Sequence, residues 1–449
     1  VSKGWATAEQ RAKAKFPKFA KYRPTKTSMA GPNGYLLDGV QREMLDRGYS
    51  QSDLDLGGYR IVTTFDKDAQ QAAVEAVDGS APYDRDRFLR LGVASVRPGT
   101  GEVVAMYGGS DYLENQYSDA DQATAMAGST FKPFALAAAL EEGIAIDSTW
   151  DGSSPRTIRG YRVPNQGGQS FGTITLQRAT EMSVNTVYVD VAGTVGHEKV
   201  RQAAIRAGVP EQTLGLVADP TTVLGTSSPR ALDMANAYAT FAARGIKAQP
   251  TMIKEIRRNQ GSVEHRLEPR TTRVFSEDVA DEVNYVLRKV VTQGTGFAAR
   301  GLGRPAAGKT GTTDSNLSAW FVGYTPELST AVMMARSSAK GDSVSLSGTG
   351  GMSSVSGGSY PARIWTSFMS GALSGLPVSD FVDPSGRSDR WGESYASPST
   401  SSGSPSPSAT KKTKTPTAAP PRPPSGPATP VPTTAPPAPA TPTPSLSGP

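Results

Sequence analysis

The stretch Gly128-Ser-Thr-Phe-Lys132-Pro-Phe134 opens the one long alanine- and leucine-rich run in the first half of the chain. Residues 134–142 continue it as strong helix formers, and Gly143 follows them. This pattern predicts a helix that has Gly143 at its C-terminal cap. Ser129 and Lys132 are three positions apart, so they share one face of the first helical turn.

A serine and a lysine on one face of a helix N-terminus form a candidate nucleophile and base. The exposed N–H groups and the positive end of the helix dipole favour negative charge that develops near Ser129. Lys132 can accept a proton at neutral pH only if its pKa falls by several units from about 10.4, which burial and a second cation can achieve. We therefore expect the rest of the sequence to supply that cation. Taken alone, a serine in such a pattern is usually an ordinary N-cap.

Composition excludes several classes of function. The chain has 449 residues, no cysteine and two histidines. This length can bury one large core or two. Disulfides and thiolate metal sites are excluded, and two histidines cannot build a metal centre alone, so we expect no metal and no cofactor. The sequence has neither a signal peptide nor an apolar run of 18 residues, and we expect the chain as given to be soluble.

The net charge of +6 is unevenly distributed along the chain. Residues 1–30 carry eight lysines and arginines against one glutamate, and residues 396–449 carry four against no acidic residue, so residues 31–395 are mildly acidic. An acidic body argues against nucleic-acid binding. The basic stretch 13–23 is either a solvated segment or a contact with an anionic membrane surface.

The composition changes abruptly near Ser397. Of the 35 prolines, 17 lie in residues 396–449, which contain no aromatic residue. Such a stretch cannot bury enough apolar area to offset its ordering entropy, so we expect a disordered tail, either a spacer or an extension without function. The predicted organisation is a lead-in and connector at 1–60, a central domain at 61–385 and the tail at 386–449.

The central residues alternate between strand and helix patterns. We expect a helix at 35–47, a strand at 59–65, a helix at 68–77, a hairpin of 89–96 with 102–107, mostly helix to about Gly245, and strands at 251–257, 318–324 and 330–334. This order of strands, then helices, then strands predicts an α/β chain of the α+β type. Its segments, far apart in sequence, would form one antiparallel sheet packed on a helical block.

Two further motifs carry polar side chains that could act together with Ser129 and Lys132. Ser183-Val-Asn185 stands at a predicted helix edge, where a cap is its usual role. Residues 307–313 precede a turn and the strand 319–324. The pattern predicts a hairpin whose first strand carries Lys309, with Gly311 permitting close approach of another backbone.

The three motifs together are more specific than any one of them. S-x-x-K at 129–132, S-x-N at 183–185 and K-T-G at 309–311 form a constellation typical of penicillin-binding proteins and serine β-lactamases. With the segments 228–241, 294–296, 304–313 and 319–324, they make residues 32–375 resemble the transpeptidase domain of a class A penicillin-binding protein.

The resemblance implies a β-lactamase/transpeptidase-like antiparallel sheet covered by helices, with a helical sub-block. Residues 32–78 resemble the connector that follows a glycosyltransferase domain in this family. We therefore expect that an upstream glycosyltransferase domain and its membrane anchor are missing here. The implied location of the full-length protein is extracytoplasmic and anchored to the cell membrane.

The resemblance also implies a serine D,D-transpeptidase that cross-links peptidoglycan stem peptides. Ser129 would attack the carbonyl of a peptide ending in D-Ala-D-Ala, or of a β-lactam, and form an acyl-enzyme while Lys132 takes its proton. Ser183 would pass a proton toward the leaving amine, helped by Lys309 as the second cation. The acyl group would then go to an amine of a neighbouring peptide, or to water.

The resemblance assigns the remaining residues to substrate binding. Asn185 would hold the substrate amide. Thr310 and Thr312, with Gly311 between them, would hold its terminal carboxylate. The backbone N–H groups of Ser129 and Thr312 would form the oxyanion hole. The expected partners are stem peptides and β-lactam antibiotics.

Related functions remain open. A serine β-lactamase must hydrolyse its acyl-enzyme quickly, and class A enzymes use a glutamate-held water for that step. Glu255 and Asn259 have the matching spacing but lie in a strand pattern, and Ser-Val-Asn in place of Ser-Asp-Asn favours the penicillin-binding side. A D,D-carboxypeptidase would share the same motifs, as would a penicillin-binding sensor or a structural homologue without enzyme activity.

Three unrelated site types find less support. A Ser-His-Asp hydrolase lacks a G-x-S-x-G motif, and we expect His197 and His265 at the surface, in a helix start and a turn. Residues 303–310 match a phosphate-binding loop by letter, but a strand pattern follows them instead of a helix. Residues 294–299 imitate a dinucleotide fingerprint, yet they follow a predicted helix at 283–291 instead of a strand.

Overall fold

The structure is a computed structural model that describes residues 7–14, 28–258 and 261–384. The predicted tail at 386–449 and most of the basic stretch at 13–23 lie outside the described residues. Among the residues that are described, no helix combines the length and the apolar character needed to span a bilayer.

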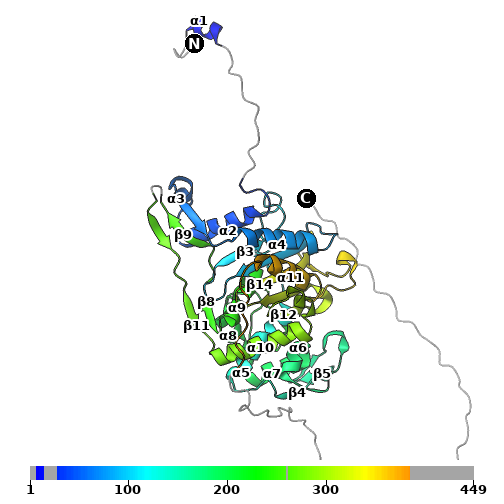
Figure 1. Ribbon diagram of the computed structural model, residues 1–449. Coiled ribbons are helices and arrows are strands. Elements are labelled where there is room, and N and C mark those ends of the chain that lie inside the picture. Colours follow the sequence, from blue (N-terminus) through cyan, green and yellow to red (C-terminus); the bar gives the residue numbers. More distant parts are fainter. Residues whose placement is uncertain (1–6, 15–27, 259–260, 385–449) are drawn as a thin grey trace, which may run out of the picture. The chain divides into compact units, whose positions relative to one another are not determined.

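A six-stranded antiparallel sheet forms the centre of the fold (Figure 1). Its main path runs β12-β13-β14-β2-β3, and β15 pairs with β14. The strands are β2 (Leu89–Val96), β3 (Val103–Tyr107), β12 (Ala307–Thr312), β13 (Ser318–Tyr324), β14 (Ser329–Ser337) and β15 (Ser343–Val344). The predicted antiparallel sheet built from distant segments is confirmed, as are both of its predicted hairpins.

Helices cover both faces of this sheet. The α-helices are α1 (Ala8–Lys13), α2 (Asn33–Asp46), α3 (Gln51–Leu56), α4 (Lys67–Ser80), α5 (Lys132–Glu141), α6 (Leu176–Glu181), α7 (Asn185–Val195), α8 (His197–Ala207), α9 (Ala231–Ala242), α10 (Glu277–Gln293) and α11 (Tyr360–Ala372). Successive strand residues face opposite sides, so Trp320 joins one core and Phe321 the other. The α4–α11 pair covers one face, while α5 and α9 lie in the core on the other.

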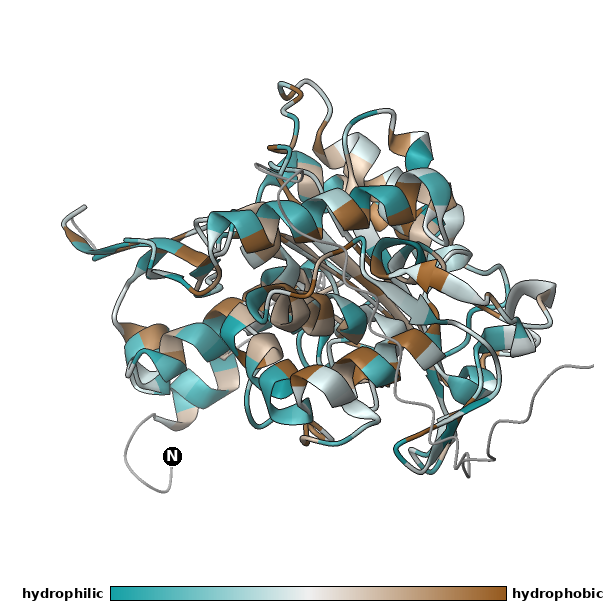
Figure 2. Cartoon of the chain, turned by 90° about the horizontal axis from the view of Figure 1, so that it is seen from below, coloured by the Kyte–Doolittle hydropathy of each residue, from teal (hydrophilic) through white to brown (hydrophobic). Residues whose placement is uncertain are grey.

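The helices differ in how deeply they are buried. Figure 2 shows hydrophilic and hydrophobic residues alternating around the outer helices, as expected for helices with one face on a core. In α5 and α9, by contrast, nearly every residue is buried. The end of α5 confirms the predicted cap: the Gly143 and Ile144 amides donate to the carbonyls of Leu140 (3.0 Å) and Ala139 (2.9 Å). A charged residue in α5 is therefore placed inside the protein.

The expectation of a single sheet was wrong for two strands. β1 (Arg60–Thr63) and β9 (Ile253–Arg257) pair with each other, and with β10 (Val263–Arg266) they form a separate three-stranded sheet. Their sequences explain the difference, because both strands carry charged residues and are partly exposed, whereas β13 is buried on both faces.

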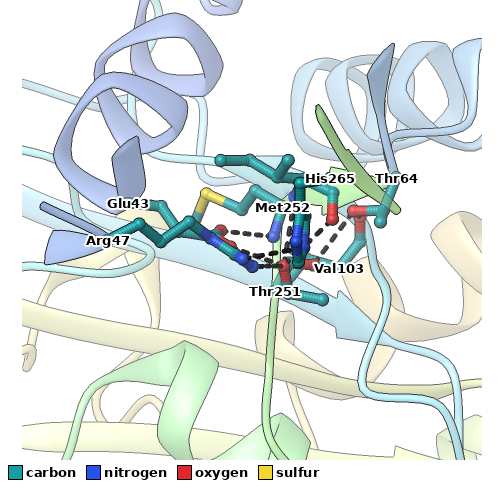
Figure 3. A network of polar contacts seen from close by, with 8 residues as sticks. Glu43, Arg47, Thr64, Val103, Thr251, Met252 and His265 are labelled. Carbon is teal, nitrogen blue, oxygen red and sulfur yellow. Dashed lines mark hydrogen bonds and ion pairs between the residues drawn. The ribbon is translucent and has the colours of Figure 1, made fainter. Parts of the chain in front are cut away.

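A polar network joins α2 to the segment that leads into β9 (Figure 3). The Glu43 carboxylate accepts from the Met252 amide (2.6 Å) and from the Thr251 hydroxyl (2.5 Å), and the Arg47 guanidinium donates to the same carboxylate. The Thr64 hydroxyl donates to the carbonyls of Val103 and Thr251. These bonds attach the residues of the predicted connector to the central sheet.

Several short elements were not predicted. The stretch expected to be mostly helical contains two small strand pairs, one of them a hairpin between the strands of the other, and another short pair follows it. These strands are β4 (Thr149–Asp151) with β7 (Thr173–Thr175), β5 (Arg156–Ile158) with β6 (Tyr161–Val163), and β8 (Ile246–Ala248) with β11 (Thr271–Arg273). Three residues are too few to show an alternating pattern. The 3-10 helices are η1 (Gly128–Phe131), η2 (Gln166–Gly168), η3 (Thr222–Leu224), η4 (Phe297–Leu302), η5 (Asp314–Asn316) and η6 (Thr349–Gly351).

Candidate active site

Ser129 lies in the 3-10 turn η1, directly before α5. The preceding Gly128 has φ +57°, and a Cβ atom on it would lie 3.0 Å from both the nitrogen and the oxygen of Thr312. The Gly128 amide donates to the Gly225 carbonyl at 2.9 Å. The turn that carries Ser129 is thus held directly against the end of β12, and only a glycine fits at position 128.

The Ser129 side chain is partly exposed, and its hydroxyl has no hydrogen-bond partner among the described residues. The structure therefore places Ser129 one turn before Lys132, as predicted, but does not join the two side chains by a hydrogen bond. Catalytic contacts of this kind often tighten only when substrate is bound.

Ser183 adopts a strained backbone at the end of α6. Its φ is +58°, in the left-handed region. The Ser183 amide donates to the Thr180 carbonyl at 3.1 Å and the Val184 amide to the Ala179 carbonyl at 2.8 Å. This is the helix-ending motif in which glycine is usual, and a residue with a side chain there costs about 1–2 kcal/mol. The turn directs both the carbonyl and the hydroxyl of Ser183 toward Lys132.

The amine of Lys132 is the centre of the site. Its Nζ lies 2.6 Å from the Ser183 carbonyl oxygen, 3.2 Å from Ser183 Oγ and 2.7 Å from Asn185 Oδ1. Lys309 on β12, the edge strand of the sheet, approaches from the other side and donates to Ser183 Oγ at 2.8 Å. The structure thus brings together four of the predicted residues, from three helix ends and a strand.

Both lysines are completely buried. Burial lowers the pKa of Lys309 from its ordinary value to about 7. Burial, followed by the charge of Lys309, holds the pKa of Lys132 well below its ordinary value, although Asp314 in η5 opposes this shift. Lys309 therefore acts on Lys132 as the second cation that the sequence led us to expect.

Thr310 and Thr312 alternate with Lys309 and Gly311 along β12, so their side chains share one face of the strand. The Thr310 hydroxyl lies 2.7 Å from the Thr295 hydroxyl, and the Gly357 amide donates to Thr312 Oγ1 at 3.2 Å. The Thr312 hydroxyl proton is left free by this contact.

Gly311 has a packing role. A Cβ atom on it would lie 2.5 Å from the Ala127 carbonyl oxygen and 2.9 Å from Cγ2 of Thr130. Gly311 therefore lets β12 press against the turn that carries Ser129, as the sequence predicted for this position.

Sequence reasoning assigned no role to two residues beside these threonines. Thr295 lies in the segment Gly294-Thr-Gly296, which contributes to the family resemblance. Its hydroxyl was the feature of the sequence that could have indicated this contact. Gly357 acts through its amide in a glycine- and serine-rich loop, and no side-chain pattern marks such a contact.

Residues that suggested competing site types lie outside this cluster. Glu255 lies in β9, as predicted, where the guanidinium groups of Arg257 and Arg266 bind its carboxylate, while Asn259 lies outside the described residues. His265 lies in β10 and not in a turn, because the turn falls earlier and this residue pairs with Ile256. His197 is the first residue of α8, as predicted.

The two segments that match nucleotide-binding motifs by letter also lack the neighbouring helix or strand that those motifs require. Lys309 lies within a strand, and η5 and another strand follow it, so no helix N-terminus stands where a phosphate-binding loop requires one. Residues 294–299 follow the helix α10, as predicted, and not a strand.

Comparison with known proteins identifies the family of this chain. A family model described as penicillin binding protein transpeptidase domain matches residues 92–349. Penicillin-binding protein 1A of Mycolicibacterium smegmatis is 36% identical over 375 residues, which cover 79% of this chain and 46% of that protein. Penicillin-binding protein 1A of Mycobacterium tuberculosis is 35% identical over 378 residues, which cover 79% and 45%.

A solved structure extends the comparison to the fold. The structure of the PonA1 protein from Mycobacterium tuberculosis in complex with penicillin V is 34% identical and has a TM-score of 0.69, covering 79% of this chain and 96% of that one. The chain spans about half the length of the curated relatives it matches. Matching motifs, fold and family model together show that this chain belongs to the penicillin-binding protein transpeptidase family, as a transpeptidase domain of the class A type.

Proposed function

We propose that this domain is a serine D,D-transpeptidase that cross-links peptidoglycan stem peptides through an acyl-enzyme on Ser129. The observation that carries the proposal is the convergence of two buried amines, those of Lys132 and Lys309, on the hydroxyl of Ser183. Two charged ammonium groups this close and this buried are unfavourable. One of them is therefore neutral, and we assign that state to Lys132, because burial and the charge of Lys309 both lower its pKa.

Hydrogen-bond accounting supports Lys132 as the base. A neutral amine has two N–H donors and one lone pair. The Ser183 carbonyl and Asn185 Oδ1 can only accept, at 2.6 and 2.7 Å, so they take the two donors. The lone pair then faces Ser183 Oγ at 3.2 Å, the longest of the three contacts, and in this mechanism it receives the Ser129 proton as Ser129 attacks the substrate carbonyl.

Lys309 and Ser183 would serve the leaving group. The charged Lys309 amine donates to Ser183 Oγ, so the Ser183 proton points elsewhere. In this mechanism Ser183 passes a proton to the departing D-alanine amine and recovers one from Lys132. The scissile C–N bond breaks as that proton arrives, which leaves the acyl group on Ser129.

The remaining polar groups would bind substrate. Asn185 holds the substrate amide, and the hydroxyls of Thr310 and Thr312 hold the terminal carboxylate on the shared face of β12. The Ser129 and Thr312 amides form the oxyanion hole, where each donor contributes about 3–4 kcal/mol to transition-state stabilisation. The close approach of Gly128 to the Thr312 nitrogen supports this pairing.

The proposal extends to ligands and to the parent protein. A relative 34% identical to this chain has been solved in complex with penicillin V, which supports acylation of Ser129 by β-lactams. We also propose that the parent protein is bifunctional, with an upstream peptidoglycan glycosyltransferase domain, and is anchored to the outer face of the cell membrane. The division into 1–60, 61–385 and 386–449 belongs to the same proposal.

The test is a turnover assay. A stem peptide ending in D-Ala-D-Ala is incubated with the chain and an acceptor amine, and mass spectrometry follows released D-alanine and cross-linked product. We expect both products, their loss in Ser129→Ala, and their retention in the exposed control Ser374→Ala. Release of D-alanine without cross-link would identify a carboxypeptidase. Cross-linking that survives Ser129→Ala would refute the proposal.

A further inference from the structure

The side chain of Asn185 is held in one orientation from two sides. Its Oδ1 accepts from Lys132 Nζ at 2.7 Å, and its Nδ2 donates to the Pro164 carbonyl at 3.1 Å. A carbonyl can only accept, so it fixes the NH2 group on the side of Pro164 and the oxygen on the side of Lys132. The second hydrogen of Nδ2 has no partner among the described residues.

The residue after Pro164 is fixed by its own side chain. Asn165 is 4% exposed, and its Nδ2 donates to the carbonyls of Gly152 (3.0 Å) and Gln169 (2.9 Å). Its Oδ1 accepts from the Thr186 amide at 3.0 Å. Both N–H groups and the oxygen of this buried amide are thus bonded, and they tie three separate segments together.

The contact with Thr186 also compensates for a missing cap. Helix α7 begins at Asn185, and the residue before it, Val184, has no side chain that could cap the first turn. Asn165 supplies that acceptor from a distant loop. Two neighbouring residues, 164 and 165, thus contact two neighbouring residues, 185 and 186.

We infer that Pro164 and Asn165 form a clamp that positions Asn185 for catalysis, with its oxygen toward Lys132 and one N–H free for the substrate carbonyl. The inference rests on the proposed function and names Asn165 as a positioning residue that acts through Asn185. Without the clamp the amide can turn over and present its NH2 group to the Lys132 amine.

The clamp has a consequence that a purely structural role lacks. The Asn185 oxygen beside Lys132 stabilises the charged form of that amine and so raises its pKa. Asp314 of η5 acts in the same direction, whereas Lys309 of β12 acts against it. Losing that oxygen lowers the pKa of Lys132 further. The acid limb of the pH–rate profile for acylation reports the loss of a proton from this base, so it should move to lower pH.

The test compares Asn165→Ala with Asn284→Ala in stopped-flow acylation by a fluorescent penicillin between pH 4 and 9. Asn284 is a matched control, because it is equally buried and donates to the Phe241 carbonyl (3.0 Å) while accepting from Tyr324 (2.7 Å). We expect Asn165→Ala to slow acylation about 10- to 100-fold at neutral pH and to shift the acid limb downward. Asn284→Ala should leave the limb in place.

A second variant covers the case in which Asn165→Ala does not fold. Pro164 is exposed, and Pro164→Gly keeps the carbonyl and Asn165 but releases the ring that fixes the backbone. It should shift the limb in the same direction by a smaller amount. If folded Asn165→Ala and Pro164→Gly keep the wild-type acylation rate and the wild-type acid limb, the clamp is refuted. In that case acylation of the wild type would still support the proposed function. Failure of the wild type to acylate would refute that function itself.

Discussion

Lys132 and Lys309 contact the same hydroxyl, with Nζ-to-Oγ distances of 3.2 and 2.8 Å to Ser183, although one belongs to a helix and the other to an edge strand. Neither amine is exposed to solvent. Such a pair titrates as one system, and its first proton is lost far below the ordinary lysine range. Below the pKa of Lys309, about 7, the site therefore holds one base and one cation.

The first prediction concerns stability against pH. The pKa of Lys309 is about 7 when folded and about 10.4 when unfolded, so between these values the unfolded chain binds the extra proton. Burial of Lys309 is thus most destabilising below pH 7, and its contribution to the free energy of unfolding rises by about 1.4 kcal/mol per pH unit from there to pH 10. Lys309→Met removes this contribution, so its curve should be flatter in urea unfolding at pH 7, 8 and 9. Parallel curves would show that Lys309 keeps an ordinary pKa.

The second prediction concerns the alkaline limb of acylation. If Lys309 must be charged to assist Ser183, the acylation rate should fall as pH rises through about 7. Lys309→Arg keeps the charge at every accessible pH, so the variant should lose this limb even where its maximal rate is lower. Lys254→Arg, on β9, is the matched control and should keep the limb. An unchanged limb in Lys309→Arg would assign it to another group.

The third prediction separates strain from chemistry at Ser183. Ser183→Gly relieves the left-handed backbone, whereas Ser183→Ala keeps the strain, and both remove the hydroxyl. Ser183→Gly should be about 1 kcal/mol more stable than Ser183→Ala, and both should acylate slowly. Urea unfolding and penicillin labelling measure the two effects. Equal stability of the variants would mean that the turn carries no strain.

The fourth prediction concerns the packing of β12 against the turn that carries Ser129. In Gly311→Ala the added methyl would meet the Ala127 carbonyl at 2.5 Å, so the strand must move away from the Ser129 turn. We expect acylation to fall about 100-fold, because such a shift misplaces the reacting groups. Gly79→Ala on α4 meets nothing within 4 Å and should leave acylation unchanged. A Gly311→Ala variant with full activity would contradict the close seating.

Much of the site could be predicted from the sequence, because the chemistry of a serine nucleophile requires particular side chains beside it. The need to lower the pKa of Lys132 pointed to a second cation, and K-T-G supplied Lys309. Apolar patterning likewise predicted the main strands of the central sheet, which are longer and more buried than β15.

What could not be predicted depends on backbone groups and on short elements. The left-handed turn at Ser183 occurs where glycine is usual, so residue type gave no warning of it. The Asn165 side chain binds backbone carbonyl and amide groups, and the Gly357 amide binds the Thr312 hydroxyl, in both cases from loops without periodicity. The partly exposed strands β1 and β9 carry too many charges to reveal which sheet they join.

Intact-mass measurement of the chain after incubation with a fluorescent penicillin, followed by peptide mapping, tests the central claim most directly. We predict one stable adduct on Ser129, absent in Ser129→Ala, retained in Ser374→Ala, and formed about 10²- to 10⁴-fold more slowly in Lys132→Ala because the general base is lost. An adduct on another residue, undiminished labelling of Ser129→Ala, or a label lost within seconds as in a β-lactamase would contradict it.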